Sequence, residues 1–206
     1  MSYRAFRYNS NGTLDTTFGN GGFKEVNFGN LSWDHARDVL LQDDGKIIVV
    51  GTAEIDTPYN SFAVARFNPD GSLDQSYGNG GKVLMINQGD LSAAALQGDG
   101  KLIALGTSGG ATVKLVRFNV DGSLDSTFGS GGTVTTSFGG AAADGSDLVF
   151  QPDGKLLAGN ITASDIYFHQ SDFALARYLV TSAPNPTPTP TPAPPKPGER
   201  PKPGTR

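Results

Sequence analysis

One sequence unit occurs three times in this chain, and this repetition constrains the fold more than any other feature. The pattern Asn-x-(Asp/Asn)-Gly-(Ser/Thr)-Leu-Asp-x-x-(Phe/Tyr)-Gly-x-Gly-Gly occupies residues 9–22, 68–81 and 119–132. A second pattern, Gln-x-Asp-Gly-Lys, recurs in step with the first at residues 42–46, 97–101 and 151–155. Self-similarity at a spacing of about 20–50 residues or slightly more is typical of solenoids and propellers, in which each copy is one supersecondary unit.

Each unit is predicted to contain four β-strands, which the middle copy shows most clearly. Short apolar runs end at Gly, Asn, Asp or Ser, and no window keeps an apolar period of 3.6 residues. The Asp-Gly pair of the second pattern predicts a tight hairpin turn between two strands. We expect the long glycine-rich loop to carry the chain from an outer strand to the inner strand of the next unit, with Leu73 and Tyr77 packed between units. The predicted strands of the middle copy are residues 82–87, 93–97, 101–107 and 112–119.

These features predict an all-β, β-propeller-like fold of three four-stranded antiparallel blades. Residues 1–180 form the predicted folded part, with repeat units at about 7–65, 66–116 and 117–176. Closed propellers contain about 4–8 blades, so this propeller is expected to be incomplete. An open arc leaves edge strands and an apolar face exposed. We therefore expect either self-association that completes a propeller or a chain that is part of a longer protein.

The repeated pattern resembles the delta-60 repeat, a family known mainly from bacterial proteins. The resemblance rests on Arg-(Phe/Tyr)-Asn-x-(Asp/Asn)-Gly-(Ser/Thr)-Leu-Asp, its glycine-rich continuation and the following Gln-x-Asp-Gly-Lys, and it covers about residues 2–180. Asn11 departs from the family pattern, because Asp70 and Asp121 occupy the equivalent positions. The resemblance implies a β-propeller of uncharacterised function and brings no catalytic or binding residues.

Residues 181–206 are predicted to be a disordered, proline- and threonine-rich tail. Ten of the 13 prolines lie between Pro184 and Pro203. This composition adopts extended, polyproline-like conformations and cannot form a core. The tail is expected to be a spacer, or alternatively a ligand for a proline-binding domain. Threonine–proline stalks favour an extracellular or cell-envelope location, although no signal-peptide pattern precedes the first repeat.

Composition and motifs exclude several functional classes. The chain has no cysteine, which excludes a disulfide scaffold and a thiol nucleophile. Its net charge of −4 argues against a nucleic-acid partner, and no apolar run is long enough for a membrane span. The alternating oxygens of residues 68–74 suggest calcium, but Leu73 and Asn79 lie where an EF-hand requires Gly and Glu. We expect an Asx-type turn there, and no metal or cofactor.

The variable loops are the best candidates for a functional site. In a four-stranded meander, all the repeated turns lie at one end of the sheets, and the variable loops lie at the other. We predict a non-catalytic binding or scaffolding module whose variable-loop surface contacts a peptide or glycan. The alternative is a lyase or glycoside hydrolase that uses Asp34, His35, Asp56 or His169 for acid–base chemistry. The predicted ligand-binding residues are Trp33, His35, Asp56, Tyr59, Tyr167 and His169.

Overall fold

The computed structural model is built of β-strands, and no helix occurs in the residues that it describes. These residues are 2–29, 33–55, 60–109, 112–140, 142–164 and 171–180. The strands are β1 (Tyr3–Phe6), β2 (Phe23–Val26), β3 (Trp33–Leu41), β4 (Ile47–Glu54), β5 (Ser61–Phe67), β6 (Lys82–Met85), β7 (Asp90–Leu96), β8 (Leu102–Ser108), β9 (Thr112–Phe118), β10 (Thr133–Ser137), β11 (Ala142–Phe150), β12 (Leu156–Ala163) and β13 (Ser171–Tyr178).

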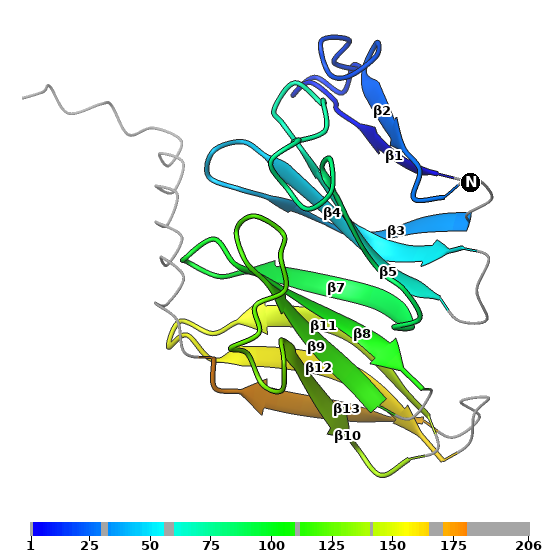
Figure 1. Cartoon of the computed structure of the whole chain (residues 1–206), viewed down its shortest axis with the longest axis vertical. Coiled ribbons are helices and arrows are strands. Elements are labelled where there is room, and N and C mark those ends of the chain that lie inside the picture. The colour runs from blue at the N-terminus through cyan, green and yellow to red at the C-terminus, as the bar shows by residue number, and fades with distance from the viewer. Residues whose placement is uncertain are drawn as a thin grey trace, which may run out of the picture.

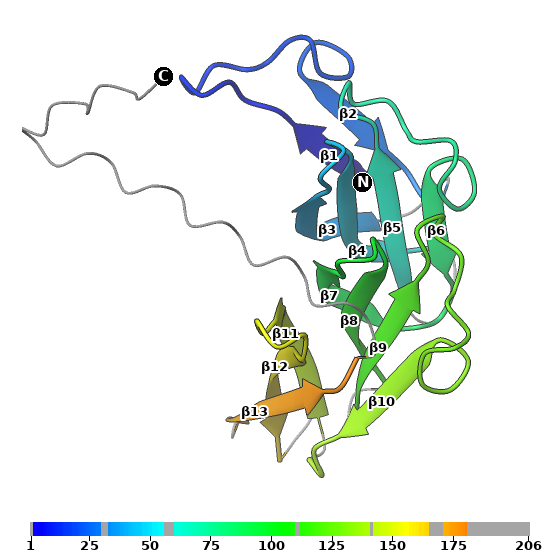
Figure 2. The same cartoon turned by 90° about the vertical axis from the view of Figure 1, so that its left-hand side faces the viewer.

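The strands form four antiparallel sheets that follow one another along the chain (Figure 1). Their strand orders are β1-β2, β3-β4-β5-β6, β7-β8-β9-β10 and β11-β12-β13. The first strands of the three later sheets (β3, β7 and β11) lie along one side of the stack, and β6 and β10 lie along the other (Figure 2). Contacts of β7 with both β3 and β11 confirm that these inner strands are neighbours. The fold is therefore all-β and has the arrangement of an incomplete β-propeller.

The blade composition differs from the expected three sheets of four strands. Within the described residues, only the two central sheets have four strands, whereas the first has two and the last has three. The strands predicted in the middle copy are all present, as β6 to β9. The repeat units are divisions of the sequence, and the sheets are offset from them by one strand.

The offset arises from the long glycine-rich loop, whose predicted path was wrong. It joins the third and the outer strand of the same sheet, because β6 pairs with β5. The loop folds back on its own strand: the amide of Asp74 donates to the carbonyl of Arg66, and the amide of Arg66 donates to the carbonyl of Gly81. These bonds return the chain to the edge of β5, so it cannot cross to the next sheet.

Apolar clusters fill the three junctions between sheets. Strands β4, β5 and β8 are buried on both faces because a sheet packs against each side of them, which explains their continuous apolar runs. Tyr77 packs in the cluster between the second and third sheets, and Leu73 packs against the cluster between the first and second. The prediction that these two loop residues pack between blades is therefore confirmed.

None of the described residues belongs to a helix that is long and apolar enough to cross a membrane.

Candidate functional site

A polar recess opens where the inner strands of three sheets begin, at the end of the molecule that carries the variable loops. We call it the polar recess; its volume is about 470 Å³. Strands β3, β7 and β11 each contribute polar groups to it. The last residue of β4, Glu54, and the residue before β5, Asn60, complete its wall. The lining residues are His35, Arg37, Glu54, Asn60, Asp90, Ser92, Asp144 and Gly145.

The three inner strands contribute equivalent positions to this recess. His35, Asp90 and Asp144 each lie seven residues before the glutamine of the repeated Gln-x-Asp-Gly-Lys turn. Each strand also has a register shift two residues later, between Ala36 and Asp38 in β3 and at the same place in β7 and β11. Such β-bulges re-aim side chains and are common beside functional sites. The three inner strands therefore have the same backbone path at the recess, and the side chains that they place there vary.

Hydrogen bonds hold the recess carboxylates in place. Asn60 Nδ2 donates to Asp90 Oδ1 over 2.8 Å, and Thr107 Oγ1 donates to Asp144 Oδ1 over 2.8 Å. His35 Nε2 lies 3.6 Å from Glu54 Oε1. Thr107 also accepts a bond from the amide of Gly145, so that it links the third sheet to the last.

The recess has an acidic character, because its three carboxylates face a single guanidinium, that of Arg37. Carboxylate oxygens accept hydrogen bonds from hydroxyl and ammonium groups, and these bonds are stronger than neutral ones. Within the described parts of the chain, no group of three His, Cys, Asp or Glu side chains is arranged to hold a metal ion. The arrangement is suited to binding a polar organic ligand.

Two of the six predicted site residues lie in the described part of the chain. His35 lines the recess, and Trp33 lies at the first position of β3 with 54% of its surface exposed. Asp56, Tyr59, Tyr167 and His169 lie outside the described residues. The recess residues Arg37, Asp90, Ser92 and Asp144 were not predicted, although their constant spacing from the repeated glutamine is a signal that could have found them.

Asp34 and His35 do not converge, because neighbouring residues of a strand point to opposite faces. Asp34 is buried toward β1, and its Oδ2 accepts a bond from the amide of Phe28 over 3.1 Å. Burial and then the nearby Asp34 carboxylate raise the pKa of the Tyr3 hydroxyl. Asp34 thus belongs to the junction between the first two sheets and not to the recess.

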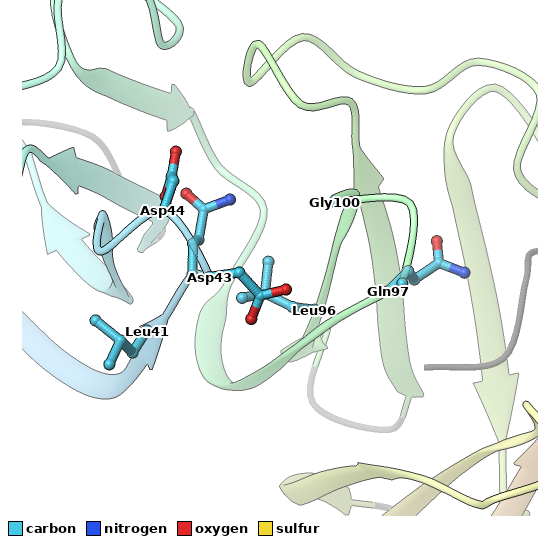
Figure 3. Close-up of a pocket in the computed structure, with 8 residues that line it drawn as sticks. Leu41, Asp43, Asp44, Leu96, Gln97 and Gly100 are labelled. Atoms are coloured by element: carbon cyan, nitrogen blue, oxygen red, sulfur yellow. The ribbon is translucent and has the colours of Figure 1, made fainter. Parts of the chain in front are cut away.

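A second hollow lies at the opposite end of the molecule, where the repeated hairpin turns meet. Its volume is about 340 Å³, and it separates the β3–β4 turn from the β7–β8 turn. Figure 3 shows its labelled side chains on these two turns, with Asp43 on one and Leu96 on the other. In each turn the backbone amide of the glutamine donates to the backbone carbonyl of the lysine, as in Gln42 and Lys46 over 2.9 Å. This hollow follows from the packing of two equivalent repeat turns, so the polar recess is the stronger candidate.

Comparison with known proteins agrees with the fold. Residues 3–18, 42–77 and 97–128 match the model of a family described as "Domain of unknown function (DUF5122) beta-propeller". These three segments contain residues 9–18, 68–77 and 119–128, the first part of each repeated long loop, and two of the repeated hairpin turns. A search of the curated proteins gave no match. The chain is therefore similar to a β-propeller repeat family of unknown function.

Proposed function

We propose that this chain is a non-catalytic binding module whose ligand enters the polar recess. The observation that carries the proposal is the variation at one repeated position. The backbone places His35, Asp90 and Asp144 equivalently, and all three line the same recess, yet one carries an imidazole and the other two carry a carboxylate. By contrast, the positions that form the hairpin turns, such as their glutamines and glycines, carry the same residue in every copy.

The chemistry of the recess favours a ligand with hydroxyl or ammonium groups, as in a glycan or a lysine-containing peptide. The exposed indole of Trp33 supplies an apolar surface at the entrance, on which a sugar ring or a side chain can stack. We include Asp56, Tyr59, Tyr167 and His169 in the proposed contact surface because they belong to the neighbouring variable loops.

The test is a screen of the purified protein against an immobilised glycan array and a displayed peptide library. An Asp90→Ala/Asp144→Ala variant is expected to lose at least about tenfold in affinity for any ligand found, since a charged hydrogen bond contributes about 1.5–3 kcal/mol. The matched control is Asp70→Ala/Asp121→Ala, which removes two exposed carboxylates at the other end of the molecule. Equal affinity of the two variants for the ligand would exclude the recess as its site.

The contribution of the variable loops has its own variant. A Trp33→Ala/Tyr59→Ala/Tyr167→Ala protein removes one aromatic from each of three loops or strand ends. If that protein keeps the full affinity of the wild type, the aromatic part of the proposed contact surface is wrong.

The remaining features are proposed from the sequence. We propose that residues 1–180 form the folded part, in units of about 7–65, 66–116 and 117–176, that residues 181–206 act as an extended spacer, and that the protein acts at the cell surface or envelope. The repeat family that the pattern resembles is the bacterial delta-60 repeat. We also propose that the incomplete propeller self-associates.

A further inference from the structure

In the second and third sheets, an arginine and a lysine together bind an aspartate of the long loop of the same sheet. Asp74 Oδ2 lies 2.8 Å from Arg66 Nε and 3.1 Å from Lys46 Nζ. The arginine belongs to the third strand of the sheet, and the lysine directly precedes the second strand. Two cations on one oxygen make a strong, charge-assisted binding site for a carboxylate. The corresponding residues of the third sheet are Asp125, Arg117 at 2.8 Å and Lys101 at 2.7 Å.

The last sheet has both cations of such a site. Lys155 directly precedes β12, and Arg177 of β13 pairs with Leu157, the second residue of β12. The arginines of the other two sheets pair with the second residue of β4 and of β8 in the same way. Hydrogen bonds from Lys155, and to a smaller extent the charge of Arg177, hold the pKa of the Asp153 carboxyl below its ordinary value. Both cations therefore act at one place, which we call the Lys155–Arg177 cradle.

The sequence after Arg177 lacks the aspartate that fills the equivalent sites. Each repeated loop has an aspartate eight residues after its arginine, but the residue eight positions after Arg177 is Asn185, and residues 178–206 contain no aspartate. Among the described residues, no ion pair includes Arg177, and its side chain is exposed. The side chains of Arg66 and Arg117 are only 5% and 6% exposed in their filled sites. A following loop of this chain therefore supplies no aspartate to the Lys155–Arg177 cradle.

The bond between Lys155 and Asp153 of its own turn does not use up the cradle. In the second sheet, Lys46 Nζ lies 3.6 Å from Oδ2 of the equivalent turn residue, Asp44, and also 3.1 Å from the loop carboxylate of Asp74. An ammonium group has three donor hydrogens, so one lysine serves two carboxylates. The Lys155–Arg177 cradle can therefore accept a carboxylate from another molecule.

Each filled site also includes an aromatic ring, three residues after the aspartate. The guanidinium of Arg66 lies 4.3 Å from the ring centroid of Tyr77, and that of Arg117 lies 4.6 Å from the ring of Phe128. The amide of the aromatic residue donates to the carbonyl of the aspartate in both loops. The residue at the equivalent distance from the arginine of the last sheet is Pro188, which has neither an aromatic ring nor an amide hydrogen. The tail sequence therefore cannot reproduce the contacts of the loop.

The edge of β13 offers backbone groups to an extended peptide. Strands β5 and β9 each pair with the strand that follows their loop, β6 and β10. Among the described strands, β13 pairs only with β12. Amide and carbonyl groups at the open edge of a sheet bind extended segments by strand addition. The surroundings of the cradle therefore suit a peptide better than a free carboxylic acid.

We propose that the Lys155–Arg177 cradle binds a peptide segment of another polypeptide that carries Asp-x-x-(Phe/Tyr)-Gly. The aspartate of this segment lies between the two cations, and its aromatic ring lies on the guanidinium of Arg177. The three loops of a second copy are already bonded to their own arginines, so the occupant is a different polypeptide. Because Lys155 belongs to a hairpin turn, the cradle lies at the end of the sheet opposite the polar recess, and the proposal does not depend on the ligand of the recess.

The test uses a fluorescently labelled synthetic peptide with the sequence of residues 119–137, which contains the Asp125 loop and β10. Fluorescence anisotropy is expected to show binding of this peptide to the full chain. Arg177→Ala in the protein should weaken binding at least about tenfold, since it removes a hydrogen bond between charged groups. The matched control is Arg4→Ala, which removes another exposed arginine, from β1, and should leave the affinity unchanged. Arg177 is exposed, so its variant should fold, as circular dichroism will verify.

Changes in the peptide separate recognition of the carboxylate from strand addition alone. A peptide with Asp125→Asn is expected to bind the wild-type protein at least about tenfold more weakly than the unchanged peptide. Equal binding of these two peptides would overturn the proposal, by showing that the edge of β13 alone holds the peptide. No binding of the unchanged peptide at its highest soluble concentration would also overturn it. The Asp90→Ala/Asp144→Ala protein should bind the peptide normally, so failure here leaves the proposed ligand of the recess untouched.

Discussion

At the scale of single residues, one arginine in each repeat connects a strand to its own loop, and two of these arginines, Arg7 and Arg66, also bond to the loop of the following sheet. Arg66 Nε donates to Asp74 Oδ2 over 2.8 Å, and its Nη1 donates to the carbonyl of Val120 in the next loop over 2.7 Å. Its guanidinium also lies 4.3 Å from the ring centroid of Tyr77. The Arg117–Asp125 pair repeats this geometry, with Lys101 Nζ 2.7 Å from the same carboxylate oxygen. Because both charges are hydrogen-bonded as well as paired, the buried ion pairs have the geometry that offsets their desolvation.

These pairs lower the pKa of their carboxylates. Hydrogen bonds from Lys101 and then from Thr127 hold the pKa of Asp125 well below its ordinary value of 3.8. Burial alone would raise the pKa of Asp74, but bonds from Ser76 and the charges of Lys46 and Arg66 leave it well below that value. A carboxyl group whose pKa is lower in the folded state stabilises that state above its unfolded pKa, and this contribution is lost as the pH falls.

We therefore predict that Asp74→Asn/Asp125→Asn lowers the Tm at pH 7 by about 5 °C or more, because two buried arginines lose their counter-charges. The difference in Tm from the wild type should narrow as the pH falls below about 4, where the wild-type carboxylates begin to lose their advantage. Thermal unfolding followed from pH 7 to pH 2 measures both effects. Asp15→Asn, in the more exposed pair with Arg7, is the control and should have a much smaller effect. A difference in Tm between variant and wild type that stays constant with pH would contradict the lowered pKa values of Asp74 and Asp125.

At the scale of elements, the inner hairpins bring two backbones unusually close. The bulge at Ser92 places the carbonyl of Asp90 against Gly106 on β8, where an added Cβ would lie 2.4 Å from that oxygen and 2.6 Å from the ring of Phe62. Gly51 meets the carbonyl of His35 in the same way in the second sheet. In these two sheets glycine leaves room for the carbonyl of the recess residue, whereas Asn160 occupies the equivalent position opposite the bulge of the last sheet.

Replacement of this glycine gives an element-scale prediction. Gly106→Ala is expected to destabilise the protein by about 1–3 kcal/mol, the usual cost of forcing an extra carbon into a packed site. Chemical unfolding measures the change. Gly159→Ala is the matched control in another central strand, because no atom lies within 4 Å of the added Cβ, and it should be nearly neutral. If the two variants had equal stability, close approach at the bulge would not explain the glycine.

At the scale of the whole molecule, burial declines from the middle of the stack toward its ends. Leu102, Ile103, Ala104 and Leu105 of β8 are completely or almost completely buried because sheets cover both of their sides. In β13 each described side chain is at least partly exposed, since only the face of this sheet toward β7–β10 packs against another sheet. Local opening costs least where few apolar contacts must be broken.

The expected consequence is a gradient of amide hydrogen exchange along the stack. The amides of β8 should exchange most slowly and those of β13 at least about tenfold faster. Exchange followed by mass spectrometry resolves these segments. Uniform protection of the amides across all the sheets would show that the ends are as stable as the middle.

The local structure of this protein follows from residues that are neighbours along the chain. Turn chemistry at Asp99-Gly100 and the apolar runs on either side depend on neighbouring residues, so the hairpins and the all-β class could be predicted. The antiparallel order of the strands was enough to predict that the repeated turns lie at one end of the sheets and the variable loops at the other. His35 and Trp33 were found as candidates because they lie beside a variable loop.

Which strands share a sheet, and which side chains share a site, depends on how the sheets pack in three dimensions. Strand β6 pairs with β5 because the loop between them bonds back to Arg66, and no local signal reveals that path. Asp90 and Asp144 are 54 residues apart and meet in the recess because successive sheets stack with their inner strands adjacent. Contacts between distant residues depend on how whole sheets pack, whereas the pattern of a single strand records only that strand's own burial.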